Sequence, residues 1–134
     1  MFEIARKCLI NMLKILIIED EPLLAEMYRD KFIKSGFEVF SSFSAEEGFE
    51  IIKKEKPNLV LLDILLPIEN GITFLDWVKK DSEVSSIPML AFSNYDDEEI
   101  KRRAFKLGVK DYLIKTNYTP QEIIEKIKNI CEIK

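Results

Sequence analysis

The amino-acid sequence predicts an α/β protein in which helices cover both faces of a parallel, five-stranded sheet. Short runs of branched apolar residues alternate with amphipathic helical patterns five times along the 134 residues. No repeat, low-complexity tract or linker rich in Gly, Ser or Pro interrupts this alternation. The composition, 47% hydrophobic and 33% charged, is typical of a globular chain. Together these observations indicate a single α/β domain.

Five segments have the character of strands. Four are rich in branched apolar residues, as strands buried on both faces require. These four are residues 14–18 (KILII), 58–62 (NLVLL), 87–92 (IPMLAF) and 111–114 (DYLI). The fifth, residues 37–41 (FEVFS), alternates apolar and polar residues and is therefore expected to be a half-exposed edge strand.

Five helical patterns follow these strands in turn. They cover residues 22–35, 44–54, 71–80, 96–107 and 119–132. Ser44 with Glu47, and Thr119 with Glu122, predict a capping box at the start of two of these helices. A strand–helix unit repeated with short, right-handed connections gives a doubly wound parallel sheet. We therefore expect a flavodoxin-like (βα)5 fold with the strand order 2-1-3-4-5.

The composition excludes several classes of function. A net charge of −4 and a pI near 5.0 do not favour nucleic acid as a direct partner. The absence of histidine argues against zinc sites and Ser-His-Asp triads. Cys8 and Cys131 form no Cys-x-x-Cys pair, which is typical of reduced thiols in the cytoplasm. No membrane span or signal peptide is expected.

Polar residues follow four of the five expected strands. They are Glu19, Asp20 and Glu21 after the first, Asp63 after the third, Ser93 after the fourth and Lys115 after the fifth. Each has an ordinary alternative as a helix cap, turn residue or solvated charge. Parallel strands end at one edge of a sheet, however, so we expect these side chains to gather there.

This set of side chains suits phosphoryl transfer. Carboxylates with a turn carbonyl form a hard-oxygen site for Mg²⁺. Beside the metal, Asp63 can act as a nucleophile toward a phosphoryl group. Lys115 and Ser93 can then neutralise or hydrogen-bond the phosphoryl oxygens.

Four segments carry a resemblance to a known family, in the order KILIIEDE, NLVLLDILLPIENG, IPMLAFS and DYLIKT. With their spacings they resemble the receiver domain of response regulators in two-component signalling, from about residue 14 to residue 133. The resemblance implies a receiver domain at residues 14–134, preceded by an N-terminal extension at residues 1–13. Because the chain ends soon after the last expected helix, a stand-alone receiver is favoured, with an excised domain as the alternative.

The resemblance assigns a role to each strand-end residue. Asp63 would be the phosphoacceptor, supplied by a sensor histidine kinase or a histidine phosphotransfer protein. Glu19 and Asp20 would hold Mg²⁺ together with Asp63, and the backbone carbonyl of Leu65 would complete the protein ligands. Lys115 would bind the phosphoryl group.

Ser93 matches the switch hydroxyl of the family and Tyr112 its aromatic switch position, for which ordinary packing on an edge strand is the alternative. In the family, phosphorylation reorients the aromatic residue and reshapes the face formed by the fourth helix, fifth strand and fifth helix. We expect a signalling phosphoacceptor rather than an enzyme. It would act on an unknown downstream protein, as a monomer or a phosphorylation-dependent dimer.

Three features depart from the family pattern. Thr116 follows Lys115 where the family usually has proline, and Asn94 stands where it usually has Ala or Gly. Leu65 and Tyr95 occupy the variable positions at which the family tunes hydrolysis. Since both side chains are bulky, we expect them to obstruct the attacking water and give a long-lived phosphorylated state.

Two other functions remain open. An aspartyl-phosphate hydrolase of the haloacid-dehalogenase type also uses a strand-end aspartate, but it needs an acid two residues later, where this chain has Leu65. A degenerate receiver could serve purely as an interaction module. The intact set of Asp63, Ser93 and Lys115 argues against that reading.

Overall fold

The computed structural model describes residues 13–66, 70–94 and 96–131. Almost all of the expected N-terminal extension, residues 1–13, therefore lies outside the described residues, as does Tyr95. Among the helices that are described, none combines the length and the apolar character needed to cross a bilayer.

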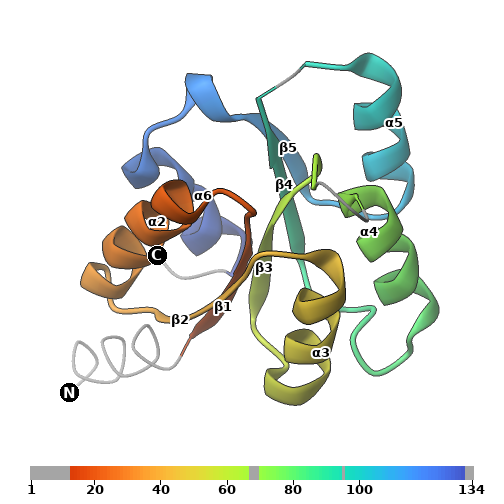
Figure 1. Ribbon diagram of the computed structural model, residues 1–134, viewed down its shortest axis with the longest axis horizontal. Helices are drawn as coiled ribbons and strands as arrows, with labels where there is room; N and C mark the ends of the chain where they lie inside the picture. Colours follow the sequence, from red (N-terminus) through yellow and green to blue (C-terminus); the bar gives the residue numbers. More distant parts are fainter. Residues whose placement is uncertain (1–12, 67–69, 95, 132–134) are drawn as a thin grey trace.

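Strands and helices alternate along the chain as expected (Figure 1). The elements are β1 (Lys14–Ile18), α2 (Pro22–Lys34), β2 (Glu38–Ser42), α3 (Ala45–Glu55), β3 (Leu59–Asp63), α4 (Gly71–Lys80), β4 (Met89–Ser93), α5 (Glu98–Lys106), β5 (Asp111–Ile114), a 3-10 turn η1 (Lys115–Asn117) and α6 (Pro120–Ile130). All strand pairs are parallel, and the order is β2-β1-β3-β4-β5. The predicted fold and strand order are confirmed.

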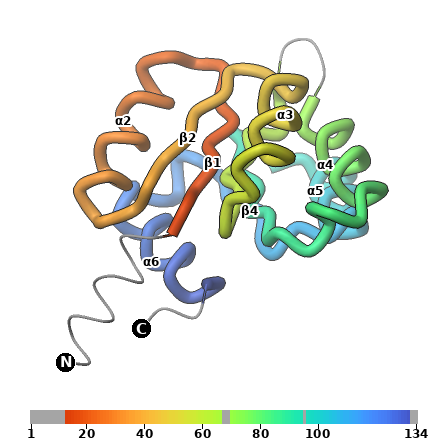
Figure 2. The backbone as a smooth tube through the Cα atoms, turned by 90° about the horizontal axis from the view of Figure 1, so that it is seen from below, coloured from red at the N-terminus to blue at the C-terminus, as the bar shows by residue number. Residues whose placement is uncertain are grey.

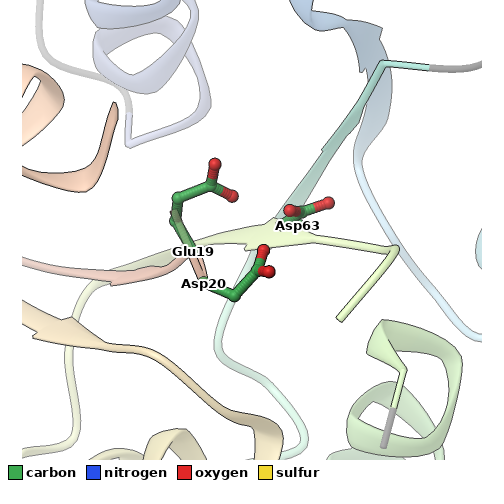
Figure 3. A group of neighbouring side chains, drawn as sticks. All are labelled: Glu19, Asp20 and Asp63. Atoms are coloured by element: carbon green, nitrogen blue, oxygen red, sulfur yellow. The ribbon is translucent and has the colours of Figure 1, made fainter. Parts of the chain in front are cut away.

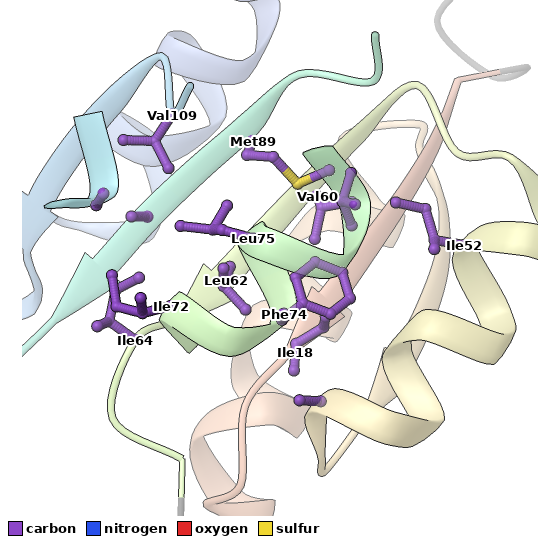
Figure 4. Packing of buried hydrophobic residues seen from close by; sticks show 14 of the residues in the cluster. Ile18, Ile52, Val60, Leu62, Ile64, Ile72, Phe74, Leu75, Met89 and Val109 are labelled. Atoms are coloured by element: carbon purple, nitrogen blue, oxygen red, sulfur yellow. The ribbon is translucent and has the colours of Figure 1, made fainter. Parts of the chain in front are cut away.

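The sheet separates two hydrophobic cores. Helices α2 and α6 lie together on one face, and α3, α4 and α5 cover the other (Figures 1 and 2). Alternate residues of the central strands therefore point into different cores: Val60 and Leu62 of β3 join one cluster (Figure 4), and Leu59 and Leu61 join the other. Because β3 is buried along its whole length, it holds the residue at its end in a fixed position.

Two local expectations need correction. Asp63 and Ser93 were expected to follow their strands, but each is the last residue of its strand, because the ladder continues through the pairs Asp63–Phe92 and Ser93–Ile114. Ser44 does accept a hydrogen bond from the Glu47 N–H. The capping box is nevertheless incomplete.

The reciprocal bond is missing at Ser44 because its own N–H donates to the Oγ of Ser42 at 3.3 Å. The capping box of α6, by contrast, has both bonds, between Thr119 and Glu122.

Gly71 fixes the loop between β3 and α4 close to the end of β3. Its N–H donates to the Ile64 carbonyl at 2.7 Å. A Cβ at this position would lie 2.8 Å from the Asp63 carbonyl and 2.7 Å from the Ile64 Cα, both backbone atoms that cannot move aside. Glycine therefore allows α4 to begin directly against the strand end that carries Asp63.

Candidate metal and phosphoryl-transfer site

Three carboxylates meet where β1 and β3 end (Figure 3). Glu19, Asp20 and Asp63 each offer an oxygen atom, and these oxygens all lie within 4.8 Å of one another. Glu19 is fully buried, Asp63 is almost fully buried, and Asp20 is partly exposed. Oxygen ligands at this spacing are those that Mg²⁺ prefers in proteins, so the donor set fits the ion expected from the sequence.

The backbone around the strand ends positions these side chains. The Glu19 N–H donates to the Ser42 carbonyl at 3.0 Å, which extends the pairing of β1 with β2 by one residue. The Leu65 N–H donates to Oδ1 of Asp63 at 3.0 Å. This bond fixes the Asp63 carboxylate relative to the loop that carries the Leu65 carbonyl, the fourth expected metal ligand.

Lys115 reaches the same carboxylates from the turn that follows β5. Its Nζ donates to both oxygens of Glu19 at 3.0 Å and to Oδ2 of Asp63 at 3.1 Å. The ammonium also lies 4.6 Å from the centre of the Phe92 ring, a favourable cation–π distance. Within the described residues, Lys115 is the one cation that pairs with this group of three carboxylates.

Burial first, and the neighbouring negative charge second, raise the pKa values of two of these carboxylates. Burial raises the pKa of Glu19 to about 8, and the neighbouring Asp63 adds to the rise, while Lys115 opposes it. Burial also raises the pKa of Asp20, again with a contribution from Asp63. A further cation at this position would therefore relieve a repulsion that a single lysine leaves in place.

A cavity of about 340 Å³ opens onto the carboxylates. It is lined by Glu19, Asp20, Glu21, Pro22, Asp63, Leu65, Asn94 and Lys115. Leu65 is 39% exposed and Asn94 is also exposed, and these two of the residues that depart from the family pattern border the opening. The cavity brings together the expected acidic residues, Leu65 and Lys115. Glu21 lines it too, but Glu21 is solvent-exposed and makes no side-chain cap bond to α2.

Ser93 and Tyr112 contact each other beside this site. Ser93 is fully buried at the end of β4, and Tyr112 on β5 is only 7% exposed. Burial raises the pKa of Tyr112, and a side-chain hydrogen bond with Ser93 lowers it. The Lys101 ammonium of α5 lies 5.8 Å from the centre of the Tyr112 ring. The two expected switch residues are therefore linked, with the tyrosine in an inward position.

Tyr28, on the buried face of α2, also lies close to the acidic residues. It is 3% exposed and packs edge-on against Phe92 at 5.5 Å between ring centres. Burial raises its pKa to about 12, with further contributions from the charges of Glu19 and Asp63. Tyr28 therefore lies beneath the acidic site. Nothing in the helical spacing of α2 indicates this, since it depends on how α2 packs against β4.

Comparison with known proteins identifies the family. Residues 15–128 match the family model of the response regulator receiver domain. The transcriptional regulatory protein CrdR of Helicobacter pylori is 34% identical over 102 residues, covering 76% of this chain and 47% of that protein. The polar-differentiation response regulator DivK of Brucella ovis is 30% identical over 115 residues, covering 86% of this chain and 93% of that protein. The chain thus spans about half the length of the first relative and nearly all of the second.

A solved structure supports the same assignment. A response regulator receiver domain protein from Methanospirillum hungatei superimposes with a TM-score of 0.84 at 26% identity, over 90% of this chain and 94% of that one. The family match covers most of the sequence, and the fold and strand order agree with it. The chain belongs to the response regulator receiver domains of two-component systems.

Proposed function

We propose that Asp63 is the phosphoacceptor of this receiver domain and that Mg²⁺ assists the transfer. The observation that carries the proposal is the group of three carboxylates, which Lys115 alone neutralises among the residues that the structure describes. Glu19, Asp20 and Asp63 would hold the metal with the Leu65 carbonyl, and the metal would neutralise charge on the phosphoryl oxygens.

The transfer itself requires positioning more than acid–base chemistry. An oxygen of Asp63 forms a bond to phosphorus as the bond between phosphorus and the donor breaks, and the donor leaves with that electron pair. Lys115, already 3.1 Å from Asp63, would exchange a carboxylate oxygen for a phosphoryl oxygen. The acidic residue that a hydrolase needs two positions after the nucleophile is replaced by Leu65.

Ser93 and Tyr112 would convey the state of Asp63 to the surface. A Ser93 hydroxyl that donates its one proton to a phosphoryl oxygen can no longer donate it to Tyr112, so the hydrogen bond between the two side chains would change. Such an exchange would favour one orientation of the tyrosine over another, which is a population shift caused by differential contacts. We propose a cytoplasmic histidine kinase or phosphotransfer protein as the phosphoryl donor, with a downstream protein reading the change.

A small acyl phosphate tests the proposal directly. Incubated with Mg²⁺, the protein should gain the mass of one phosphoryl group, and removal of the metal with a chelator should prevent this gain. Asp63→Asn should abolish it because the nucleophilic oxygen is lost. Asp30→Asn, a matched change of an exposed carboxylate on α2, should leave it intact.

Two outcomes would overturn the assignment. Continuous release of phosphate without a stable adduct supports the hydrolase instead. No reaction under any metal condition supports a degenerate receiver used only for binding.

A further inference from the structure

A second cavity lies away from the acidic site, in a groove between α3 and α4. Its volume is about 870 Å³, larger than the cavity at the carboxylates. It is lined by Glu46, Phe49, Glu50, Trp77, Lys80, Asp81 and Ser82. The two helices run side by side on one face of the sheet (Figures 1 and 2). We call this feature the α3–α4 groove.

Each wall of the α3–α4 groove is one stripe of a helix. Glu46, Phe49 and Glu50 are spaced by three and four residues on α3, so they share a face. Trp77 projects from α4 and meets Phe49 edge-on, with ring centres 5.7 Å apart. Both rings are partly buried and pack against the core below, and they remain partly exposed toward the groove. The floor of the groove is therefore aromatic.

The charges around this aromatic floor are not balanced. Lys80 pairs with Asp76 at 2.8 Å, and Asp81 pairs with Lys53 at 2.7 Å. Among the described residues, no lysine or arginine pairs with Glu46 or Glu50 of α3. Two carboxylates four residues apart repel each other on a helix, so this pair weakens α3 unless a cation from elsewhere lies between them.

We propose that the α3–α4 groove docks an arginine-bearing segment of a partner protein. A guanidinium group stacks on an indole ring and forms paired hydrogen bonds with carboxylates, and Trp77 and Glu50 offer both groups at one site. Apolar side chains flanking the arginine would fill the remaining volume over Phe49. The proposal is independent of phosphoryl transfer at Asp63, so failure of one leaves the other standing.

Trp77 is the single tryptophan of the chain, so its fluorescence reports directly on the groove. The probe is an acetylated, amidated tetrapeptide that alternates leucine and arginine. The control peptide carries citrulline, which is uncharged but similar in shape, in place of arginine. The arginine peptide should give a saturable change in Trp77 emission and should bind at least about tenfold more tightly than the citrulline peptide.

Paired variants locate the contact. Glu46→Gln with Glu50→Gln should reduce binding of the arginine peptide to the level of the citrulline peptide. Glu47→Gln is the matched control, because Glu47 is exposed on the same helix but does not line the groove. Trp77→Phe, measured by calorimetry, should weaken binding while keeping an aromatic ring against the core. Circular dichroism checks that each variant is folded.

Four results would overturn the proposal: no saturable change with the arginine peptide, equal binding of the citrulline peptide, unchanged binding to the Glu46→Gln/Glu50→Gln variant, or tighter binding of a free polyamine than of the peptide. The wavelength of maximum Trp77 emission should not depend on protein concentration when no peptide is present. A shift with concentration alone would assign the groove to a second copy of the chain and overturn the proposal as well.

Discussion

Lys115 and Lys53 each bridge two carboxylates, yet they lie in opposite environments. Lys115 donates to Glu19 and Asp63 with distances of 3.0 to 3.1 Å, and its side chain is 7% exposed. Lys53 of α3 donates to Asp81 and Glu83 in the loop after α4, at 2.7 and 3.0 Å, and is 35% exposed. By distance alone the exposed bridge would be considered the stronger of the two.

Each lysine lowers the pKa of its carboxylate partner, yet the net pKa shifts of the two carboxylates run in opposite directions. The hydrogen bond from Lys53 lowers the pKa of Asp81, as an ion pair in water does. Burial raises the pKa of Glu19 to about 8 despite two hydrogen bonds from Lys115. Burial rather than distance thus decides how an ion pair behaves. The buried cluster retains excess negative charge that suits a metal ion, whereas the exposed bridge links α3 to a loop.

Removing each lysine should give the largest difference between the two regions. Lys115→Met leaves two buried carboxylates without a cation, which should lower the free energy of unfolding by about 3 kcal/mol above pH 8 without metal. Lys53→Met leaves carboxylates that water solvates, so little change is expected. Urea denaturation in the presence of a chelator measures both.

Mg²⁺ sharpens this prediction. The ion should stabilise Lys115→Met more than the unaltered protein, because it replaces the lost positive charge. Equal losses of stability in the two variants, with equal responses to Mg²⁺, would show that burial makes no difference here.

The raised pKa of Glu19 predicts an unusual dependence of stability on pH. The folded state holds the Glu19 proton up to about pH 8, whereas the unfolded chain releases it near the ordinary value of 4.5. This contribution to stability is therefore complete below pH 4.5 and is lost as the pH rises to about 8. In metal-free protein, Glu19→Gln should be more stable than the unaltered chain at pH 8, by about 2 kcal/mol.

Thermal unfolding between pH 5 and pH 8 tests this expectation, with Glu26→Gln on the exposed surface of α2 as the control. The melting temperature should depend less on pH in Glu19→Gln than in the unaltered chain, and the control variant should behave like the unaltered chain. If the melting temperature of Glu19→Gln depends on pH as strongly as that of the unaltered chain, a group other than Glu19 holds the proton in the folded state.

Access of water to the buried site gives a third test, which rests on the proposed role of Asp63. Leu65 borders the cavity, and its side chain should obstruct water that attacks a phosphoryl group on Asp63. Leu65→Ala should therefore shorten the lifetime of the phosphorylated protein by about threefold to tenfold, a modest change in barrier. Ile33→Ala, a matched truncation of an exposed aliphatic side chain on α2, should not. Loss of the phosphoryl mass with time gives the lifetimes, and equal rates would exclude Leu65 as the obstruction.

The sequence predicts this fold well because each signal is local or follows from strand direction. Apolar runs such as residues 58–62 identify the buried strands. Parallel strands end at one edge, which is sufficient to expect Asp63, Glu19 and Lys115 near one another. The structure agrees with that expectation: Glu19 and Asp63 lie together in Figure 3, and the Lys115 Nζ donates to both.

Features that depend on packing between elements could not be predicted from the sequence. The position of Tyr28 beneath the acidic residues depends on how α2 packs against Phe92. The α3–α4 groove depends on the spacing of two helices that no local pattern encodes. The incomplete capping box at Ser44 results from competition by Ser42, a neighbour whose side-chain direction is set by the sheet. In each case two groups compete or meet only after the chain has folded.

Added salt should give the smallest difference between the two lysine bridges, seen as a change in the pKa of their carboxylates. It is also the most direct test of how exposed each bridge is. At about 1 M salt the Debye length is about 3 Å, so the exposed attraction between Lys53 and Asp81 is screened. The pKa of Asp81, lowered at low ionic strength, should then rise toward its ordinary value of 3.8. The pKa of Glu19 should change less, because its first cause is burial, which salt does not screen. Carboxyl NMR shifts followed through a pH titration measure both groups in one sample.

In Lys53→Met the salt response of the Asp81 pKa should disappear and that of the Glu19 pKa should not change. If Glu19 instead responds to salt as strongly as Asp81, solvent ions reach the cluster, and repulsion by Asp63 rather than burial is the main cause of its raised pKa.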